Sequence, residues 1–167
     1  FLSDAGFERE HFVFQGRKAW LIKPTKGLPG KPWVWRAHFP EWHTEVDSIL
    51  LSEGFHIVYL NTNDMFGSNA AMQIWDAFYE YLVRQRGFSP IVDLEGVSRG
   101  GLYVYQWAKR NPLKVSCIYA EAPVCDIKSW PGGKGKGKGS PQDWNKLLTE
   151  YQFSEEDALG FLDNPMD

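Results

Sequence analysis

The sequence has few cysteines, no long apolar run and no excess of basic residues. Its two cysteines, Cys117 and Cys125, are eight residues apart. An extended segment of that length spans ~26 Å, which is too far for a disulfide, so we expect two buried thiols. No apolar run approaches the ~20 residues of a membrane-spanning helix, and we expect a soluble protein without a membrane partner. The net charge of −3 excludes a basic surface for nucleic acid.

The composition is that of one globular domain. A chain of 167 residues is long enough to bury a sizeable core, and we expect residues 1–167 to form a single domain. Aromatic residues make up 16% of the chain, with eight tryptophans. Because Trp and Tyr are enriched both in cores and in binding surfaces, this abundance alone does not indicate a function.

The spacing of apolar residues predicts an alternation of strands and helices. In the first part we expect elements at residues 11–24 (a hairpin around Gln15-Gly16), 31–40 (a strand), 44–53 (a helix) and 55–63 (a buried strand). The remainder predicts elements at residues 69–86 (a helix ended by Gly87), 90–98 (a strand), 101–110 (a helix), 115–124 (a strand) and 154–163 (a helix). Such an order is typical of an α/β fold, with a mostly parallel central sheet and helices on both faces.

One segment interrupts this order. Residues 130–144 read WPGGKGKGKGSPQDW, and alternating Gly and Lys are not expected to hold a regular element. We interpret residues 127–145 as a Gly/Lys-rich excursion over the functional site, where the lysines would meet an anionic group. A solvated loop tip is the alternative.

The candidate nucleophile is Ser98 in Gly96-Val97-Ser98-Arg99-Gly100. The motif G-x-S-x-G follows an apolar strand and precedes a helical pattern, which is the context of a nucleophile elbow. There the serine adopts a strained conformation that projects its hydroxyl, and small neighbours make room for the sharp turn. A glycine-rich turn without chemistry is the alternative. We therefore predict that Ser98 lies in a strained turn between a central strand and a helix.

With these motifs, the sequence resembles the α/β-hydrolase superfamily over nearly its whole length. The segments PWVWRAHF, NDMFGS, EGVSRGG and APVCDIKSWPGG are more closely similar to a bacterial esterase-type subgroup found among polysaccharide-degrading proteins. The resemblance implies that Ser98 is the nucleophile. It also implies an oxyanion hole made by the backbone N–H of Arg99 and by a second N–H from Arg36 or Ala37.

The sequence departs from this family in its histidines. The family presents its catalytic residues in the order serine, acid, histidine, but all four histidines here precede Ser98. The last two strands and their helices are also missing from the pattern, so we expect an incomplete fold. A missing C-terminal segment or a second chain would complete it and supply the histidine. Asp126, just past a strand, is either the acid or a pocket residue, and an aspartate that caps a turn is the structural alternative.

Together these features predict a serine ester hydrolase that acts on a small acyl ester, with a carbohydrate as the suggested alcohol. Trp35, Trp42 and Trp130 are candidate sugar-stacking residues, with core packing as the alternative for each, and His38 is expected near the substrate. We expect no cofactor and no metal. A peptidase of the same fold and a non-catalytic binding module remain alternatives. The resemblance leaves the bacterial compartment open between cytoplasm, periplasm and secretion.

Overall fold

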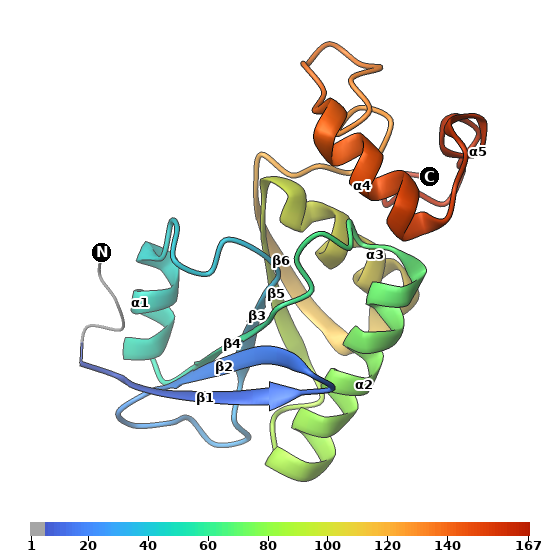
Figure 1. Ribbon diagram of the computed structural model, residues 1–167. Coiled ribbons are helices and arrows are strands. Elements are labelled where there is room, and N and C mark those ends of the chain that lie inside the picture. Colours follow the sequence, from blue (N-terminus) through green and yellow to red (C-terminus); the bar gives the residue numbers. More distant parts are fainter. Residues whose placement is uncertain (1–5) are drawn as a thin grey trace.

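The computed structural model describes residues 6–167, which form a six-stranded mixed sheet with helices on both faces (Figure 1). In chain order the elements are β1 (Glu8–Phe14), β2 (Arg17–Lys23), β3 (Trp33–Arg36), α1 (Glu45–Ser52), β4 (His56–Leu60), α2 (Asn69–Arg86), β5 (Val92–Val97), α3 (Gly101–Arg110), β6 (Val115–Glu121), α4 (Pro141–Tyr151) and α5 (Glu155–Leu159). One-turn 3₁₀ helices at Ser98–Gly100 and Pro112–Lys114 flank α3.

The strands lie in the order β1-β2-β4-β3-β5-β6. The pairs β3/β4, β3/β5 and β5/β6 are parallel, whereas β1/β2 and β2/β4 are antiparallel. The carboxyl ends of β3, β5 and β6 therefore lie together at one end of the strands. In open α/β sheets, ligands bind just beyond these carboxyl ends.

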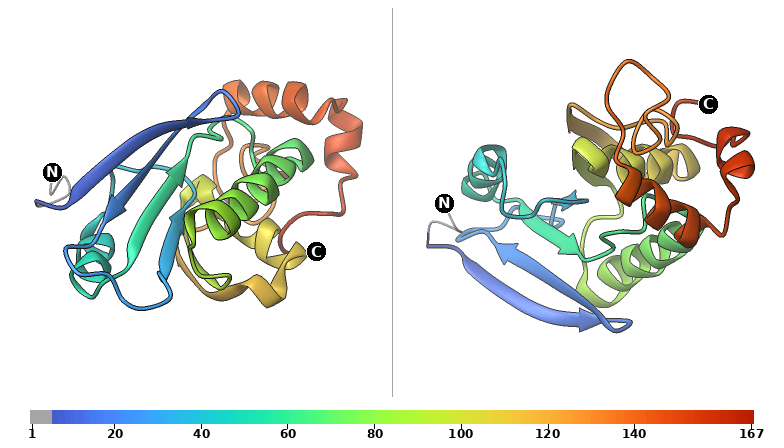
Figure 2. Two further views of the ribbon diagram at one scale, coloured as in Figure 1. Left: turned by 90° about the horizontal axis from the view of Figure 1, so that it is seen from below. Right: turned by 45° about the horizontal axis from the view of Figure 1, so that its top comes forward.

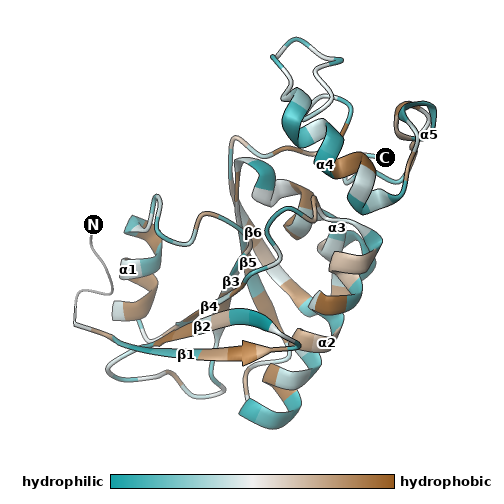
Figure 3. Ribbon diagram, in the orientation of Figure 1, coloured by the Kyte–Doolittle hydropathy of each residue, from teal (hydrophilic) through white to brown (hydrophobic). Residues whose placement is uncertain are grey.

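Each face of the sheet has its own core. Trp33 and Trp35 point from β3 toward α2 and α3, while Val34 between them points toward α1, because side chains alternate along a strand. The core on the α2/α3 side is by far the larger, and α4 lies beside these two helices with α5 beyond it (Figures 1 and 2). Figure 3 shows that the central strands are hydrophobic, as expected for strands buried on both faces.

Local sequence signals explain the helix and turn boundaries. Ser68 accepts a hydrogen bond from the Ala71 N–H at the start of α2, and Gly87 ends the helix with a φ of 71°. The hairpin turns at Gln15 and Gly16, both with positive φ. The predicted hairpin and the predicted helix at residues 69–86 are confirmed.

The expectation that residues 130–144 hold no regular element is wrong for the last residues of this segment, which belong to helix α4. Helix α4 begins at Pro141, where proline lacks only an N–H that a first turn does not need. Ser140 caps this helix by accepting a hydrogen bond from the Asp143 N–H. The glycine-rich composition before residue 140 obscured a helix start that the Ser-Pro pair could have indicated.

Strand β6 forms one edge of the sheet. Val115, Ile118 and Val124 are half-buried against the main core, whereas Tyr119 on the other face of β6 is 45% exposed. The apolar surface left open beside this edge therefore lies on the α1 side of the sheet. No helix within residues 6–167 has the length and apolar character needed to cross a membrane.

Candidate active site

Ser98 lies in a sharp turn between β5 and α3. Its φ is +52°, a left-handed conformation that costs energy for a residue with a side chain. A Cβ at Gly96 would lie 2.6 Å from Val104 Cγ2, so the strand can approach α3 only with glycine there. The Ser98 carbonyl accepts a hydrogen bond of 2.8 Å from the Val124 N–H, and the residue is half-buried. Ser98 thus has the backbone geometry of a nucleophile elbow.

Gly101, one position after the motif, is enclosed as tightly as Gly96. A Cβ at Gly101 would lie 2.6 Å from the Val124 carbonyl oxygen, whereas one at Gly100 would have 3.5 Å to Ala37 Cβ. The close approach of α3 to the chain after β6 therefore depends on Gly101. Gly100 instead keeps the start of the helix close to the loop that follows β3.

The predicted oxyanion hole is only partly compatible with the hydrogen bonds. The Ala37 N–H donates to the Glu95 carbonyl at 3.0 Å, so Ala37 is not free to bind an oxyanion, and that prediction is wrong. Among the turn and loop hydrogen bonds of residues 6–167, the backbone N–H of His38 donates none. The His38 nitrogen is 3.8 Å from the position of a Cβ on Gly100, next to the elbow. The His38 N–H, rather than that of Ala37, is therefore the loop N–H without a backbone acceptor beside the elbow.

Arg36, the other predicted oxyanion residue, organises the loop with its side chain. The residue is the last of β3, and its side chain is fully buried. Its guanidinium pairs with Asp47 at 3.1 Å and with Glu95 at 2.8 Å. It also donates to backbone carbonyl oxygens of the loop, those of Phe39, Trp42 and His43. Arg36 thus fixes the backbone on which the His38 N–H lies.

Glu95 and Asp47 put two carboxyl groups beside a single guanidinium. Burial and the neighbouring Asp47 raise the pKa of Glu95 far above its usual range, and the Arg36 charge offsets only part of this. A protonated Glu95 can donate to Asp47 while it accepts from Arg36. The cluster is then a neutral, buried support beneath the loop.

His38 is buried beside the elbow but is oriented as a donor. Its Nδ1 accepts a hydrogen bond of 3.0 Å from the Phe39 N–H, so the neutral ring carries its proton on Nε2. Burial, with Arg99 nearby, lowers the pKa of His38 to about 4. This ring cannot accept the proton of Ser98 in this tautomer. It can donate a hydrogen bond to a bound group, in keeping with its predicted place near the substrate.

A second histidine close to the elbow was missed in the sequence. His43 Nδ1 is 3.2 Å from Glu121 Oε1, and Glu121 is the register partner of Val97, the residue before Ser98. Both side chains are about 40% exposed. A histidine–carboxylate pair thus lies one strand away from the candidate nucleophile. The sequence carried no clear signal for it, because strand order is needed to bring these residues together.

Asp126 holds a turn. Its Oδ1 accepts a hydrogen bond of 2.7 Å from the Lys128 N–H, and its carbonyl accepts from Ser129 and Trp130. Within residues 6–167 no histidine is bonded to its carboxylate. The geometry is that of the turn-capping alternative, and a catalytic role for Asp126 has no support from its contacts.

The three candidate sugar-stacking tryptophans have different surroundings. Trp35 is fully buried, with its ring 3.9 Å from that of Trp75, so it is a core residue and its predicted substrate role is wrong. Trp130 is half-buried, and the Arg99 guanidinium lies 4.4 Å from its ring. Trp42 is 51% exposed in the loop that Arg36 organises. Trp42 and Trp130 remain available to a ligand.

Residues 127–145 contact the site through Trp130 and Asp143, at the two ends of the segment, and not through the Gly/Lys tip at residues 133–139. Arg99, the residue after Ser98, has Trp130 on one side and an ion pair of 3.6 Å with Asp143 of α4. The Gly/Lys tip extends away from the sheet above α4 (Figure 1), and residues 133–139 are exposed. Within residues 6–167 no cluster of three potential metal ligands is found.

No family model matches the sequence, and no curated protein does. A lipase/esterase from Lactobacillus plantarum superposes with a TM-score of 0.57 at 15% identity, covering 87% of this chain and 71% of that one. The chain has the α/β-hydrolase fold.

Two further structures with this fold extend the range of activities. Acetyl xylan esterase from Aspergillus awamori has a TM-score of 0.55 at 11% identity, with 66% of this chain and 50% of that chain covered. Acylaminoacyl peptidase from Pyrococcus horikoshii has a TM-score of 0.53 at 18% identity, with 74% and 24% covered. The α/β-hydrolase fold of this chain therefore occurs in esterases and in peptidases, and the activity must be argued from the site.

Proposed function

We propose that the protein is a serine ester hydrolase acting on a small acyl ester, with a carbohydrate as the alcohol. The observation that carries this proposal is the left-handed φ of Ser98 between β5 and α3. Strained residues persist where the surrounding structure enforces them, and they cluster at active sites. Ser98 also follows the carboxyl end of β5, and ligands bind beyond the carboxyl ends of the strands in this class of sheet.

In the proposed reaction, the Ser98 hydroxyl attacks the ester carbonyl. The backbone N–H groups of Arg99 and His38 stabilise the negative charge that develops on the carbonyl oxygen. A histidine outside these 167 residues takes the proton of Ser98 and passes it to the departing alcohol. His43, which pairs with Glu121, is the alternative base within the chain.

The carbohydrate part of the proposal rests on two aromatic side chains and one structural neighbour. Trp42 and Trp130 offer aromatic faces near the elbow, and aromatic rings pack well against an apolar face of a ligand. A structural neighbour is an acetyl xylan esterase. The peptidase neighbour keeps hydrolysis of an acylated peptide as the second candidate.

The test is Ser98→Ala in the natural gene product, assayed with p-nitrophenyl acetate and acetylated xylan. We expect the rate to fall by about 10⁶-fold with the fold intact, because only the residual acceleration of about 10³–10⁴-fold from binding and the oxyanion hole remains. Ser116→Ala, exposed at the far end of β6, is the matched control and should keep full activity. Equal rates for wild type and Ser98→Ala would end the serine-hydrolase proposal.

Two further measurements separate the alternatives. His43→Ala should leave the rate within a few-fold of wild type if the base lies outside the chain, and should match Ser98→Ala if His43 is the base. Hydrolysis of acyl-peptide substrates in preference to acetate esters would support the peptidase. Absence of any hydrolysis, together with no labelling of Ser98 by a fluorophosphonate, would support the non-catalytic module.

A further inference from the structure

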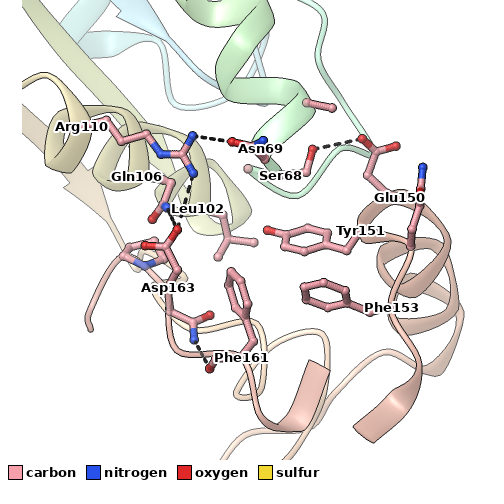
Figure 4. A pocket seen from close by; sticks show the side chains of 15 residues that line it. Ser68, Asn69, Leu102, Gln106, Arg110, Glu150, Tyr151, Phe153, Phe161 and Asp163 are labelled. Atoms are coloured by element: carbon pink, nitrogen blue, oxygen red, sulfur yellow. Dashed lines mark hydrogen bonds and ion pairs between the residues drawn. The ribbon is translucent and has the colours of Figure 1, made fainter. Parts of the chain in front are cut away.

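A pocket of about 310 Å³ lies on the helical side of the molecule, away from Ser98. The start of α2, one face of α3, the end of α4 and residues 161–165 enclose it (Figure 4). Neither Ser98 nor the neighbouring Arg99 and His38 line it. Its volume is at the lower end of the ~300–1,000 Å³ of small-molecule sites.

One wall of the pocket is aromatic. The rings of Tyr151, Phe153 and Phe161 pack against one another, with centroids 5.3 to 5.7 Å apart. The Tyr151 hydroxyl donates a hydrogen bond of 2.7 Å to the Phe66 carbonyl, which anchors this ring. The wall offers a preformed apolar surface to a ligand.

The opposite wall carries charges that are already paired. The Arg110 guanidinium donates to Asn69 Oδ1 at 2.8 Å and lies 3.6 Å from the Asp163 carboxylate. Asp163 also pairs with Lys109 at 3.0 Å. Since each charge faces an opposite charge or a dipole, the wall selects neither an anion nor a cation.

The side-chain oxygen of Gln106 is a hydrogen-bond acceptor to which no group of residues 6–167 donates. Its side chain is in the lining of the pocket, and the residue is only 3% exposed. Its Nε2 donates to Asp163 at 3.3 Å, but within residues 6–167 its Oε1 receives no hydrogen bond. A buried polar atom of this kind normally has a partner. The Oε1 atom is itself covered, so a ligand hydroxyl would reach it through a rotation of the Gln106 side chain and would then supply the missing donor.

We propose that this pocket binds a neutral sugar ring. An uncharged ligand with hydroxyl groups on one side and a C–H face on the other matches the paired polar wall, the Gln106 acceptor and the three aromatic rings. The site is separate from Ser98, so the proposal does not depend on hydrolytic activity.

The test is saturation-transfer NMR and calorimetry on the full chain with xylobiose and methyl β-glucopyranoside. We expect millimolar binding, with transfer strongest to the C–H protons of one ring. Phe153→Ala should weaken binding by about tenfold because the ring loses its stacking surface. Gln106→Met, which keeps the length of the side chain without its acceptor, should weaken it similarly. Tyr81→Ala, a half-buried aromatic outside the pocket, is the matched control and should bind as wild type does.

Absence of binding of either sugar to the wild-type chain would overturn the proposal. So would binding that Phe153→Ala and Gln106→Met both leave unchanged. Tighter binding of tetramethylammonium or benzoate, used as charged probes, would overturn the neutral ligand class. Circular dichroism of each variant shows that a loss of binding is not a loss of fold.

Discussion

Replacing Glu95 with glutamine is expected to change how the stability of the protein depends on pH. Glu95 is 1% exposed, and its Oε1 accepts a hydrogen bond of 2.8 Å from Arg36. Burial and the neighbouring Asp47 raise the pKa of Glu95, so the folded protein holds a proton there at neutral pH. Glutamine has the same shape, can accept from Arg36 and can donate to Asp47, but it does not titrate.

The sign and size of the effect follow from proton linkage. An unfolded chain releases the Glu95 proton near pH 4.3, whereas the folded chain keeps it to a much higher pH. The contribution of Glu95 to stability is therefore fully present below the unfolded pKa and is lost as pH rises toward the folded pKa. Within that window the free energy of unfolding falls by about 1.4 kcal/mol per pH unit relative to Glu95→Gln.

The assay is urea unfolding followed by tryptophan fluorescence. From about pH 5.5 to about pH 7.5, the stability of Glu95→Gln should rise by about 2.7 kcal/mol relative to wild type. Asp47→Asn removes the like charge that helps to raise the pKa of Glu95, so its pH dependence should be closer to that of Glu95→Gln. Parallel curves for wild type and Glu95→Gln would refute the reasoning, because they would show that Glu95 is ionised in the folded protein.

Two further predictions concern the elbow and the edge of the sheet. Gly101→Ala should destabilise the protein by about 1–3 kcal/mol in urea unfolding, since its Cβ would clash with the backbone after β6. Gly137→Ala, in open space, is the control and should change stability by less than about 0.5 kcal/mol. The isolated 167-residue chain should associate or bind hydrophobic dyes, because β6 is an unpaired parallel edge. A cooperative melt from a dilute, monodisperse monomer would contradict this last expectation.

Much of the fold could be predicted because its signals are local. The hairpin, α2 and the strand–turn–helix around Ser98 each carry their own period and their own terminating residues. Helix α4 was missed because the Gly/Lys composition before it outweighed a short start signal at Ser140 and Pro141. A local signal is easily overlooked when its neighbours have a strong opposite bias.

The candidate site was harder to predict because it depends on which strand ends lie together. The sequence does not show whether the Ala37 N–H has an acceptor. In the structure β3 lies beside β5, and this N–H donates to the Glu95 carbonyl. His43 and Glu121 are far apart in the chain and pair only because β6 is the other neighbour of β5. Trp35 could equally face a ligand or a helix until the position of Trp75 is known.

The geometry around Ser98 argues for more than a structural connection. A turn from strand to helix can be made with glycine at the left-handed position, at no steric cost. Here a serine occupies that position, while glycine is used at Gly96 and Gly101, where a side chain would collide with its neighbours. Glycines thus occupy the positions beside Ser98 that have no room for a side chain, whereas the left-handed backbone conformation falls on Ser98 itself. Such a distribution is expected where the hydroxyl is needed, and Ser98→Ala, which keeps the Cβ and removes only that hydroxyl, isolates its contribution.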